Sequence, residues 1–386
     1  MKHRVLFVVT YLDCGGINRA LQNLLNRLNT EMFDVSVFAM VPDGMFISLY
    51  KNCHILPRHY LLSALMARYV HQKKGLKRLF SILVKGINRL SKGAIGSIIQ
   101  KNAAKRLMKH HYDTVVAFSE GAPTAFVELM NHSNTVAWIH CDYASYWSLN
   151  NNKDELRLYS KYNHIVCVAD YPRLSFLSYY PELSTRTTTI YNILDDRMIK
   201  SLAQESVLDT FCDDQFSIVS VGRLDPVKRL SIVPKLSKRL SDAGCQFKWF
   251  VIGPKGGTLE EYEKLVHNIV EYGMEDRVFY LGEKENPYSY ISRSDLLVNT
   301  SISEACPYVI NEAKLLHTPV ICPDFGSAPE FVDDGVNGFI CAIEDMADII
   351  IRYIKDKELQ NKIKESLSTF IYDNESLLRR VEQVIS

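Results

Sequence analysis

Short apolar runs rich in β-branched residues alternate along the chain with segments of helical periodicity, and this alternation limits the fold more than any other feature. The runs of the first half are residues 5–10, 35–40, 114–118, 135–139, 164–169 and 187–190. The runs of the second half are residues 217–221, 248–252, 277–281, 295–299 and 319–322. Helical spacing fills most of the intervals, as in residues 18–28 and 231–240. Strands that alternate with helices predict parallel sheets with helices on both faces.

The chain has 386 residues, too many for one core, and the two sets of strands predict two doubly wound, Rossmann-like α/β domains. It turns polar between residues 192 and 215, so we place the boundary there, with domains of residues 1–195 and 196–386. The last helix is able to cross back to the first domain. A hydrophobic content of 47% and a charged content of 23% exclude a disordered chain.

Open parallel sheets bind ligands at the carboxyl ends of their strands, so we search for a site in the loops that follow the strands. After the first strand, Gly15 and Gly16 precede a helix, where close backbone approach and free N–H groups suit a phosphate. The loop lacks the G-x-G-x-x-G dinucleotide pattern, and the alternative is a tight turn without a ligand. Residues 251–257 form a second glycine-rich stretch after a strand, whose glycines can serve a turn alone.

Two cations follow the strand at residues 217–221. Arg223 offers a planar set of donors and Lys228 a mobile point charge, and the Pro-containing turn between them lets both converge on one diphosphate. The alternative is that both are solvated surface cations.

Two glutamates follow the strand at residues 295–299, with a helix expected to begin near Pro307. Glu304 and Glu312 are then at most about 12 Å apart along the helix. That separation suits carboxylates that bind hydroxyls at the two ends of an extended polar ligand, with a phosphate between them at the helix N-terminus. The alternative is that Glu304 caps the helix and Glu312 lies on the surface.

A histidine stands directly after the strand at residues 135–139. His140 can donate a hydrogen bond to a sugar hydroxyl or stabilise developing charge, and Asp142 can orient its ring. The alternative is a structural histidine with satisfied hydrogen bonds. Ser119, Glu120 and Gly121 close another strand in the same manner.

Several classes of protein are disfavoured by what the sequence lacks. The nine cysteines are odd in number and form no C-x-x-C motif, which argues against a disulfide framework or zinc site and for a reducing, cytoplasmic compartment. No D-x-D motif, P-loop or G-x-S-x-G motif is present. The first apolar run is too short for a signal peptide, and no stretch of 18 apolar residues is long enough to span a membrane.

Residues 44–112 contain 14 Lys and Arg but no Asp or Glu. Within them, one helical stripe collects apolar residues, namely Leu76, Leu79, Phe80, Leu83, Val84, Ile87 and Leu90. Four cations are expected to lie away from this stripe: Lys77, Arg78, Lys85 and Arg89. The pattern predicts a basic amphipathic helix on an anionic membrane surface, the alternative being a stripe that packs on the sheet. Nucleic acid is disfavoured because few aromatic residues interleave the cations.

Taken together, these motifs resemble the retaining glycosyltransferases of GT-B fold, family four, often called group 1 glycosyl transferases. The family's two glutamates with seven residues between them are similar to Glu304 and Glu312, and its Gly-Arg-Leu with a following lysine is similar to Gly222, Arg223, Leu224 and Lys228. Four further segments resemble the family: Gly15-Gly16, residues 190–195, Pro319-Val-Ile with Gly326 and Pro329-Glu330, and Asp334-Gly-Val-Asn-Gly338. Ala305 and Cys306 depart from the usual glycine and phenylalanine.

The resemblance implies a role for each matching residue. Arg223 and Lys228 would hold the donor diphosphate without a metal or other cofactor, Glu304 the hydroxyls of the donor sugar, and Glu312 the ribose. His140 would lie beside the anomeric centre, so that the catalytic residues would be His140, Glu304, Arg223 and Lys228. The donor-binding residues would be Gly15, Gly16, Arg223, Lys228, Glu304, Ala305, Cys306, Pro307, Tyr308, Val309 and Glu312.

The resemblance also implies that the two domains face a cleft, with acceptor binding in the first and nucleotide-sugar binding in the second. A hexose or N-acetylhexosamine would move from a UDP- or GDP-sugar to a glycan or lipid-linked acceptor during synthesis of cell-surface polysaccharide. The enzyme would lie at the inner membrane face. Two alternatives stay open: a nucleotide-sugar epimerase, and a non-catalytic partner of the same fold that binds glycan or stabilises a true transferase.

Overall fold

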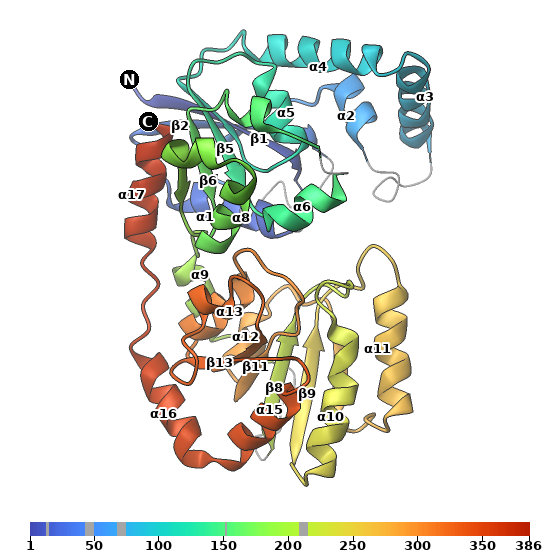
Figure 1. Cartoon of the computed structure of the whole chain (residues 1–386), viewed down its shortest axis with the longest axis vertical. Coiled ribbons are helices and arrows are strands. Elements are labelled where there is room, and N and C mark those ends of the chain that lie inside the picture. The colour runs from blue at the N-terminus through green and yellow to red at the C-terminus, as the bar shows by residue number, and fades with distance from the viewer. Residues whose placement is uncertain (13–14, 43–49, 68–74, 151–152, 208–214) are drawn as a thin grey trace. The chain divides into compact units, whose positions relative to one another are not determined.

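The computed structural model describes residues 1–12, 15–42, 50–67, 75–150, 153–207 and 215–386. The chain divides into two compact units, one of Met1–Leu194 with Asp373–Ser386 and one of Asp195–Tyr372 (Figure 1). The division at Leu194 lies one residue before the boundary placed at 195. The last fourteen residues, by contrast, belong to the first unit and not to the second.

The first unit contains one sheet of seven strands, all parallel. The strands are β1 His3–Tyr11, β2 Phe33–Val41, β3 His54–Ile55, β4 Thr114–Ala117, β5 Thr135–Ile139, β6 His164–Cys167 and β7 Thr187–Thr189. Their spatial order is β3-β2-β1-β4-β5-β6-β7, so the direction of strand addition reverses between β1 and β4. Strand β3 was not predicted from the sequence, because two residues are too few to show the alternating or apolar pattern of a strand.

The helices of the first unit are α1 Gly16–Arg27, α2 Tyr60–Met66, α3 Leu76–Leu90, α4 Ala94–Leu107, α5 Ala122–Glu128, α6 Tyr143–Leu149, α7 Leu156–Tyr159, α8 Asp170–Tyr179, the 3-10 helix Pro181–Arg186, and α17 Asn374–Ile385. Hydrogen bonds explain why α17 belongs here: Arg380 donates to the carbonyl of Thr189 in β7, and Asn374 accepts from the backbone N–H of Leu194. In the described part of the chain, no helix combines the length and apolarity needed to cross a bilayer.

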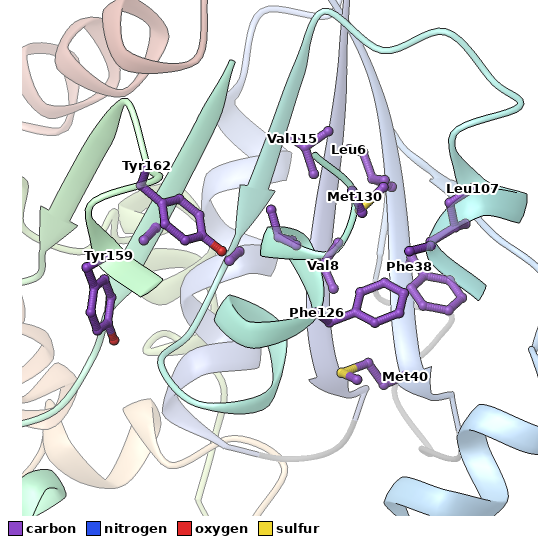
Figure 2. Close-up of a cluster of buried hydrophobic side chains, with 14 of the residues drawn as sticks. Leu6, Val8, Phe38, Met40, Leu107, Val115, Phe126, Met130, Tyr159 and Tyr162 are labelled. Carbon is purple, nitrogen blue, oxygen red and sulfur yellow. The ribbon is translucent and has the colours of Figure 1, made fainter. Parts of the chain in front are cut away.

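The core of the first unit lies where β1, β2 and β4 meet the helices packed on the sheet (Figure 2). Leu6 and Val8 of β1 are fully buried, because the centre of a parallel sheet is covered on both faces. Phe38 of β2 stacks on Phe126 of α5 with 5.8 Å between ring centroids. This packing gives the loops after β1, β4 and β5 a rigid base.

The second unit contains one parallel sheet of six strands in the order β10-β9-β8-β11-β12-β13. The strands are β8 Phe216–Val221, β9 Phe247–Ile252, β10 Val278–Gly282, β11 Leu296–Val298, β12 Val320–Pro323 and β13 Gly338–Cys341. The helices are α9 Asp196–Leu202, the 3-10 helix Leu230–Ile232, α10 Val233–Asp242, α11 Glu260–Glu271, α12 Tyr288–Ile291, α13 Tyr308–Leu315, α14 Ala328–Phe331, α15 Met346–Lys355 and α16 Lys357–Ser368. Here the strand order reverses between β8 and β11.

The prediction of two parallel-sheet α/β domains is confirmed, while strand β13 was missed. Its first residue, Gly338, lies so close to β12 that a Cβ atom would stand 2.4 Å from the carbonyl oxygen of Val320. Glycine is therefore required for the strand to approach its neighbour. A glycine in a short strand also removes the β-branched signal by which strands are recognised.

A buried hydrogen-bond chain joins three neighbouring strands of the second sheet. Trp249 of β9 is fully buried, and its Nε1 donates to Ser220 Oγ of β8 at 3.0 Å. That hydroxyl in turn donates to the carbonyl of Val298 in β11 at 2.6 Å. Ser220 thus satisfies two buried polar groups at once.

We expect Ser220→Ala to lower the free energy of unfolding by about 1–3 kcal/mol, because it leaves a buried N–H and a buried carbonyl unsatisfied. Ser237 supplies a matched control, since it is equally buried but its Oγ has no hydrogen-bond partner among the described residues. Ser237→Ala is expected to be neutral or slightly stabilising. Urea unfolding monitored by far-UV circular dichroism measures both. An equal decrease in the free energy of unfolding in both variants would contradict the stabilising role assigned to the hydrogen bonds of Ser220.

Candidate functional site

The second sheet brings two of the predicted loops together. Strands β8 and β11 are neighbours in the sheet, so the loop that follows β8 and the loop that follows β11 leave from the same edge. This is also the point at which the strand order reverses, where open α/β sheets form their ligand crevice. The cations after β8 and the glutamate after β11 therefore meet at the position that the fold favours for binding.

Lys228 and Glu304 form an ion pair across this edge, with Nζ donating to Oε1. The Lys228 side chain is 29% exposed and that of Glu304 12%. The two loops are also joined by a side-chain hydroxyl, since Thr300 Oγ1 donates to the backbone carbonyl of Lys228 at 2.7 Å. The hydrogen bond from Thr300 therefore helps to hold the ion pair in place, in addition to the attraction between its two charges.

The carboxylate of Glu304 has further supports. Ser301 Oγ donates to Oε1 at 2.7 Å, and Ser327 Oγ donates to the backbone carbonyl of Glu304, also at 2.7 Å. No side chain caps helix α13, whose N-cap is Pro307. The interpretation of Glu304 as a helix cap is therefore wrong, and Pro307 stands one position before the helix instead of inside it.

Arg223 is joined to Lys228 through a residue that the sequence reading did not single out. Its Nε and Nη2 atoms donate to Asp225 Oδ2 at 2.8 and 2.7 Å. The other oxygen, Oδ1, accepts from the backbone N–H of Lys228 at 3.0 Å. The Arg223 side chain remains 56% exposed. Asp225 thus sets the positions of both cations. Arg223 and Lys228 are partly exposed to solvent, but their positions are fixed by hydrogen bonds. An aspartate between Arg223 and Pro226 is a turn former, and this signal could have found it.

The glycine-rich stretch at residues 251–257 supports the Arg223 loop. A Cβ atom on Gly253 would lie 1.9 Å from the carbonyl oxygen of Gly222, and one on Gly256 would lie 2.1 Å from that of Leu224. Leu224 N–H also donates to the carbonyl of Pro254 at 2.9 Å. These two glycines also have φ values of +151° and +80°, so they serve close backbone approach and turn geometry.

Glu312 lies on α13 and is only 2% exposed. Its Oε1 accepts from the hydroxyl of Tyr288 in α12 at 3.3 Å. The interpretation of Glu312 as a surface residue is therefore wrong. A buried carboxylate is costly without polar partners, and Tyr288 is one that sequence reasoning missed because it comes from a different helix.

The remaining donor-binding candidates of this unit surround the start of α13. Ala305 and Cys306 are half-buried in the loop, and Tyr308 and Val309 begin the helix. The first turn carries no acidic residue. A helix start of this kind presents the positive end of its dipole to an approaching anion.

In the first unit, Gly15 is the N-cap of α1 and Gly16 its first residue. A Cβ atom on either glycine would meet no atom of the described residues within 4 Å. Gly15 makes no side-chain cap hydrogen bond, and the first turn of the helix carries no acidic residue. Residues 13 and 14 of the same loop lie outside the described residues.

His140 follows β5, and its backbone N–H donates to Glu120 Oε2 at 2.9 Å. Burial lowers the pKa of the imidazole to about 3, so the ring is neutral at physiological pH. Its Nε2 is buried and has no hydrogen-bond partner in the described part of the chain. Burial also raises the pKa of the Glu120 carboxyl, while the His140 N–H opposes that shift. Glu120, which closes the neighbouring strand β4, thus positions the histidine.

The expectation that Asp142 orients the His140 ring is wrong. Asp142 caps α6, accepting from Ala144 N–H at 3.2 Å and from the hydroxyls of Ser145 and Ser175 at 2.8 and 2.7 Å. The ring packs instead against Phe118, with 4.9 Å between centroids. No group of three or more His, Cys, Asp or Glu that could hold a metal ion occurs among the residues that the structure describes.

The sequence matches the family of glycosyl transferases group 1 over residues 209–368. It is 26% identical to the N-acetyl-alpha-D-glucosaminyl L-malate synthase of Bacillus anthracis over 204 residues, 51% of each chain. It is 27% identical over 184 residues, 47% of each chain, to a Campylobacter jejuni enzyme named N-acetylgalactosamine-N,N'-diacetylbacillosaminyl-diphospho-undecaprenol 4-alpha-N-acetylgalactosaminyltransferase. The chain thus spans about half the length of these curated relatives.

Similar solved structures cover almost the whole chain. Anabaena Alr3699/HepE in complex with UDP-glucose has a TM-score of 0.74 at 19% identity and covers 98% of each chain. Sucrose-phosphate synthase from Thermosynechococcus elongatus has a TM-score of 0.75 at 15% identity and covers 99% of this chain and 98% of its own. At such identities the likeness shows the fold, which is GT-B. Residues 209–368, in the second unit, are the part of the chain that matches the group 1 glycosyl transferases.

Proposed function

We propose that this protein is a retaining glycosyltransferase that uses a UDP- or GDP-sugar and needs no metal ion. The observation that carries the proposal is the Lys228–Glu304 ion pair at the strand-order reversal, with Arg223 tied to the same turn through Asp225. Two cations and a carboxylate at one sheet edge match the charges of a nucleoside-diphosphate sugar. The phosphates need positive charge, and the sugar hydroxyls need acceptors.

The two cations act on the leaving group. As the glycosidic bond to the donor phosphate breaks, negative charge grows on the diphosphate, and Arg223 and Lys228 neutralise it in the manner of an oxyanion-binding group. Lys228 is already positioned by Asp225 and Thr300, so little rearrangement is needed. Lys228 exchanges part of its interaction with Glu304 for the phosphate, which leaves the carboxylate able to accept from sugar hydroxyls.

The hydroxyls of the donor are assigned to the two glutamates. Glu304 binds the sugar, and Glu312 with Tyr288 binds the ribose. A nucleotide-sugar donor is supported by the structure of Anabaena HepE in complex with UDP-glucose. The names of two relatives contain an N-acetylhexosaminyl group. The proposed sugar is accordingly a hexose or N-acetylhexosamine.

The first unit is assigned to the acceptor, a glycan or lipid-linked sugar in cell-surface polysaccharide synthesis. The neutral imidazole of His140, with its unpartnered Nε2, suits a hydrogen bond to a sugar hydroxyl. The name of the Campylobacter relative, which contains diphospho-undecaprenol, supports a lipid-linked acceptor. We further propose that the protein acts in the cytoplasm as a peripheral protein on the inner membrane face.

Donor binding is tested by thermal shift with UDP, GDP and ADP, each in excess EDTA and again with Mg²⁺. One nucleotide should raise the melting temperature by mass action, equally with and without metal. Hydrolysis or transfer of the corresponding nucleotide-sugar in EDTA then tests catalysis. Binding without turnover on any acceptor would favour the non-catalytic partner, and activity that requires Mg²⁺ would contradict metal independence.

Arg223→Ala and Lys228→Ala should each lower kcat by about 10²–10³-fold, which is on the order of 3 kcal/mol of lost transition-state stabilisation. Matched controls are Arg239→Ala, which breaks an exposed Arg–Asp pair with Asp348, and Lys161→Ala, which breaks a Lys–Glu pair with Glu128. Both controls should keep wild-type kcat under saturating donor. Equal rates in all four variants would exclude the proposed role of the two cations.

The lowered pKa of His140 predicts a pH dependence of stability. The unfolded imidazole titrates near 6.5 and the folded one near 3, so between these values the unfolded state binds more protons and stability falls as the pH falls. His140→Gln should reduce this slope by at most about 1.4 kcal/mol per pH unit, with no change above pH 7. Urea unfolding at pH 4.5, 5.5 and 7.5 measures the effect. An unchanged slope would show that the ring is already accessible to protons in the folded state.

A further inference from the structure

Helix α3 presents its apolar side to solvent. The side chains concerned, called the apolar row below, are those of Leu76, Leu79, Phe80, Leu83, Ile87 and Leu90. Leu76 and Leu90 at the two ends are 85% and 87% exposed, and Leu79 and Leu83 between them are 63% and 58% exposed. Three- and four-residue spacing places all six on one side of the helix. Contiguous exposed apolar surface of this kind marks an interaction site in a soluble protein.

The opposite side of α3 faces the protein and is mainly polar. Ser81 Oγ donates to the carbonyl of Ala64 at 2.5 Å, and Lys85 Nζ donates to that of Ala67. Asn88 Oδ1 accepts from the backbone N–H of Gly96 at 2.7 Å. Val84 is the buried apolar residue on this side. Burial lowers the pKa of Lys85, as expected for an ammonium turned towards the protein.

The structure therefore corrects the expected helix in two respects. Val84 belongs to the buried side and not to the exposed stripe, and Lys85 points into the protein instead of away from it. The alternative in which the stripe packs on the sheet is also wrong, because α3 packs on α2 and α4 and the row stays exposed (Figure 1). Hydrogen bonds from the polar side hold the helix in this orientation.

Exposed cations occur on α3 and on the neighbouring helix α4. Lys77, Arg89 and Lys92 are exposed on or directly after α3, and Lys101 and Lys105 are exposed on α4. No Asp or Glu occurs in residues 44–112, so this segment of the sequence carries positive charge without acidic residues. Arg68, Lys73 and Lys74 of this basic region lie outside the described residues. An exposed apolar row on a helix that also exposes cations matches a bilayer whose headgroups are anionic and whose interior accepts leucine side chains.

A second copy of the chain fits this surface less well. A two-fold symmetric contact would place the same cations of both copies against each other, and like charges oppose that arrangement. Nucleic acid would satisfy the cations but would leave six large apolar side chains in water. An anionic lipid surface satisfies both components at once.

We propose that α3 lies on the surface of an anionic bilayer with the apolar row inserted to the level of the acyl chains. Lys77, Arg89 and Lys92 then contact lipid phosphates, and Ser81 and Asn88 keep the helix attached to the rest of the unit. The inference deepens the peripheral membrane location proposed above, but it rests on the first unit alone and does not require nucleotide binding or turnover.

The test uses the full chain and vesicles of phosphatidylcholine with or without 40% phosphatidylglycerol. Wild type should cosediment with the anionic vesicles at 0.1 M NaCl and be released at 1 M, where the Debye length falls to about 3 Å. Leu79→Ser with Leu83→Ser should weaken the partition coefficient at least about tenfold, because two inserted side chains are lost. Leu259→Ser with Val270→Ser removes side chains that are 54% and 63% exposed in the second unit, and this matched control should bind as wild type.

Insertion of the apolar row into the bilayer is measured by the fluorescence of the Leu83→Trp variant. Tryptophan emission should shift to shorter wavelength with anionic vesicles and be quenched by brominated acyl chains, whereas Val270→Trp should show neither change. UDP or GDP thermal shifts on the α3 variants should stay at the wild-type value, which separates a failure here from a failure of the proposed transferase. The proposal is overturned if the Leu79/Leu83 variant binds vesicles like wild type. It is equally overturned if wild type binds no vesicle and the double variant instead abolishes a dimer seen by analytical ultracentrifugation.

Discussion

The contact on which the candidate site depends is the ion pair between Lys228 and Glu304, residues 76 positions apart in the chain. The pair exists because β8 and β11 are neighbours at the point where the strand order reverses. Its surroundings are polar and ordered: Asp225 holds the lysine backbone, and Ser301 holds the carboxylate. A partly buried pair of this kind costs desolvation energy and contributes little stability alone. Its position at a sheet edge agrees with the donor-binding role proposed for it.

Two supports behind the site show how backbone packing prepares this chemistry. The glycines at 253 and 256 let one loop press on the backbone of the Arg223 loop, where any Cβ atom would collide with a carbonyl oxygen. In the first unit, Glu120 performs a comparable task by fixing the backbone of His140. In both units the groups proposed to meet the substrate are held by neighbours that need not touch it, as preorganised electrostatic catalysis requires.

The first unit contains two unlike regions: a buried polar one near the centre of its sheet and an exposed apolar one on helix α3. Near β4 and β5 it buries a neutral histidine and a carboxyl of raised pKa. At α3 it exposes both leucines and cations to solvent, and leucine side chains are not stabilised by exposure to water. The usual orientation of a surface helix, with its apolar stripe inward, is reversed in α3, where Ser81 and Lys85 on the inner side donate to the backbone carbonyls of Ala64 and Ala67. These polar contacts hold the inner side of the helix, and its apolar side stays exposed.

The sequence alone determined the two parallel sheets, the loops that carry Arg223, Lys228, Glu304 and His140, and the apolar stripe near α3. Each of these follows from local periodicity or from the loop that a strand leads into. The tertiary structure decided which groups meet. Only in space did Asp225 pair with Arg223 and Tyr288 with Glu312, although the turn signal marked Asp225 as a candidate. The short strands β3 and β13 formed against their neighbours, and α17 joined the first unit through Arg380 and Asn374. It also decided that α3 turns its leucines outward. The physical reason is that strand order and helix orientation depend on contacts between residues far apart in the chain, which a periodic pattern does not encode.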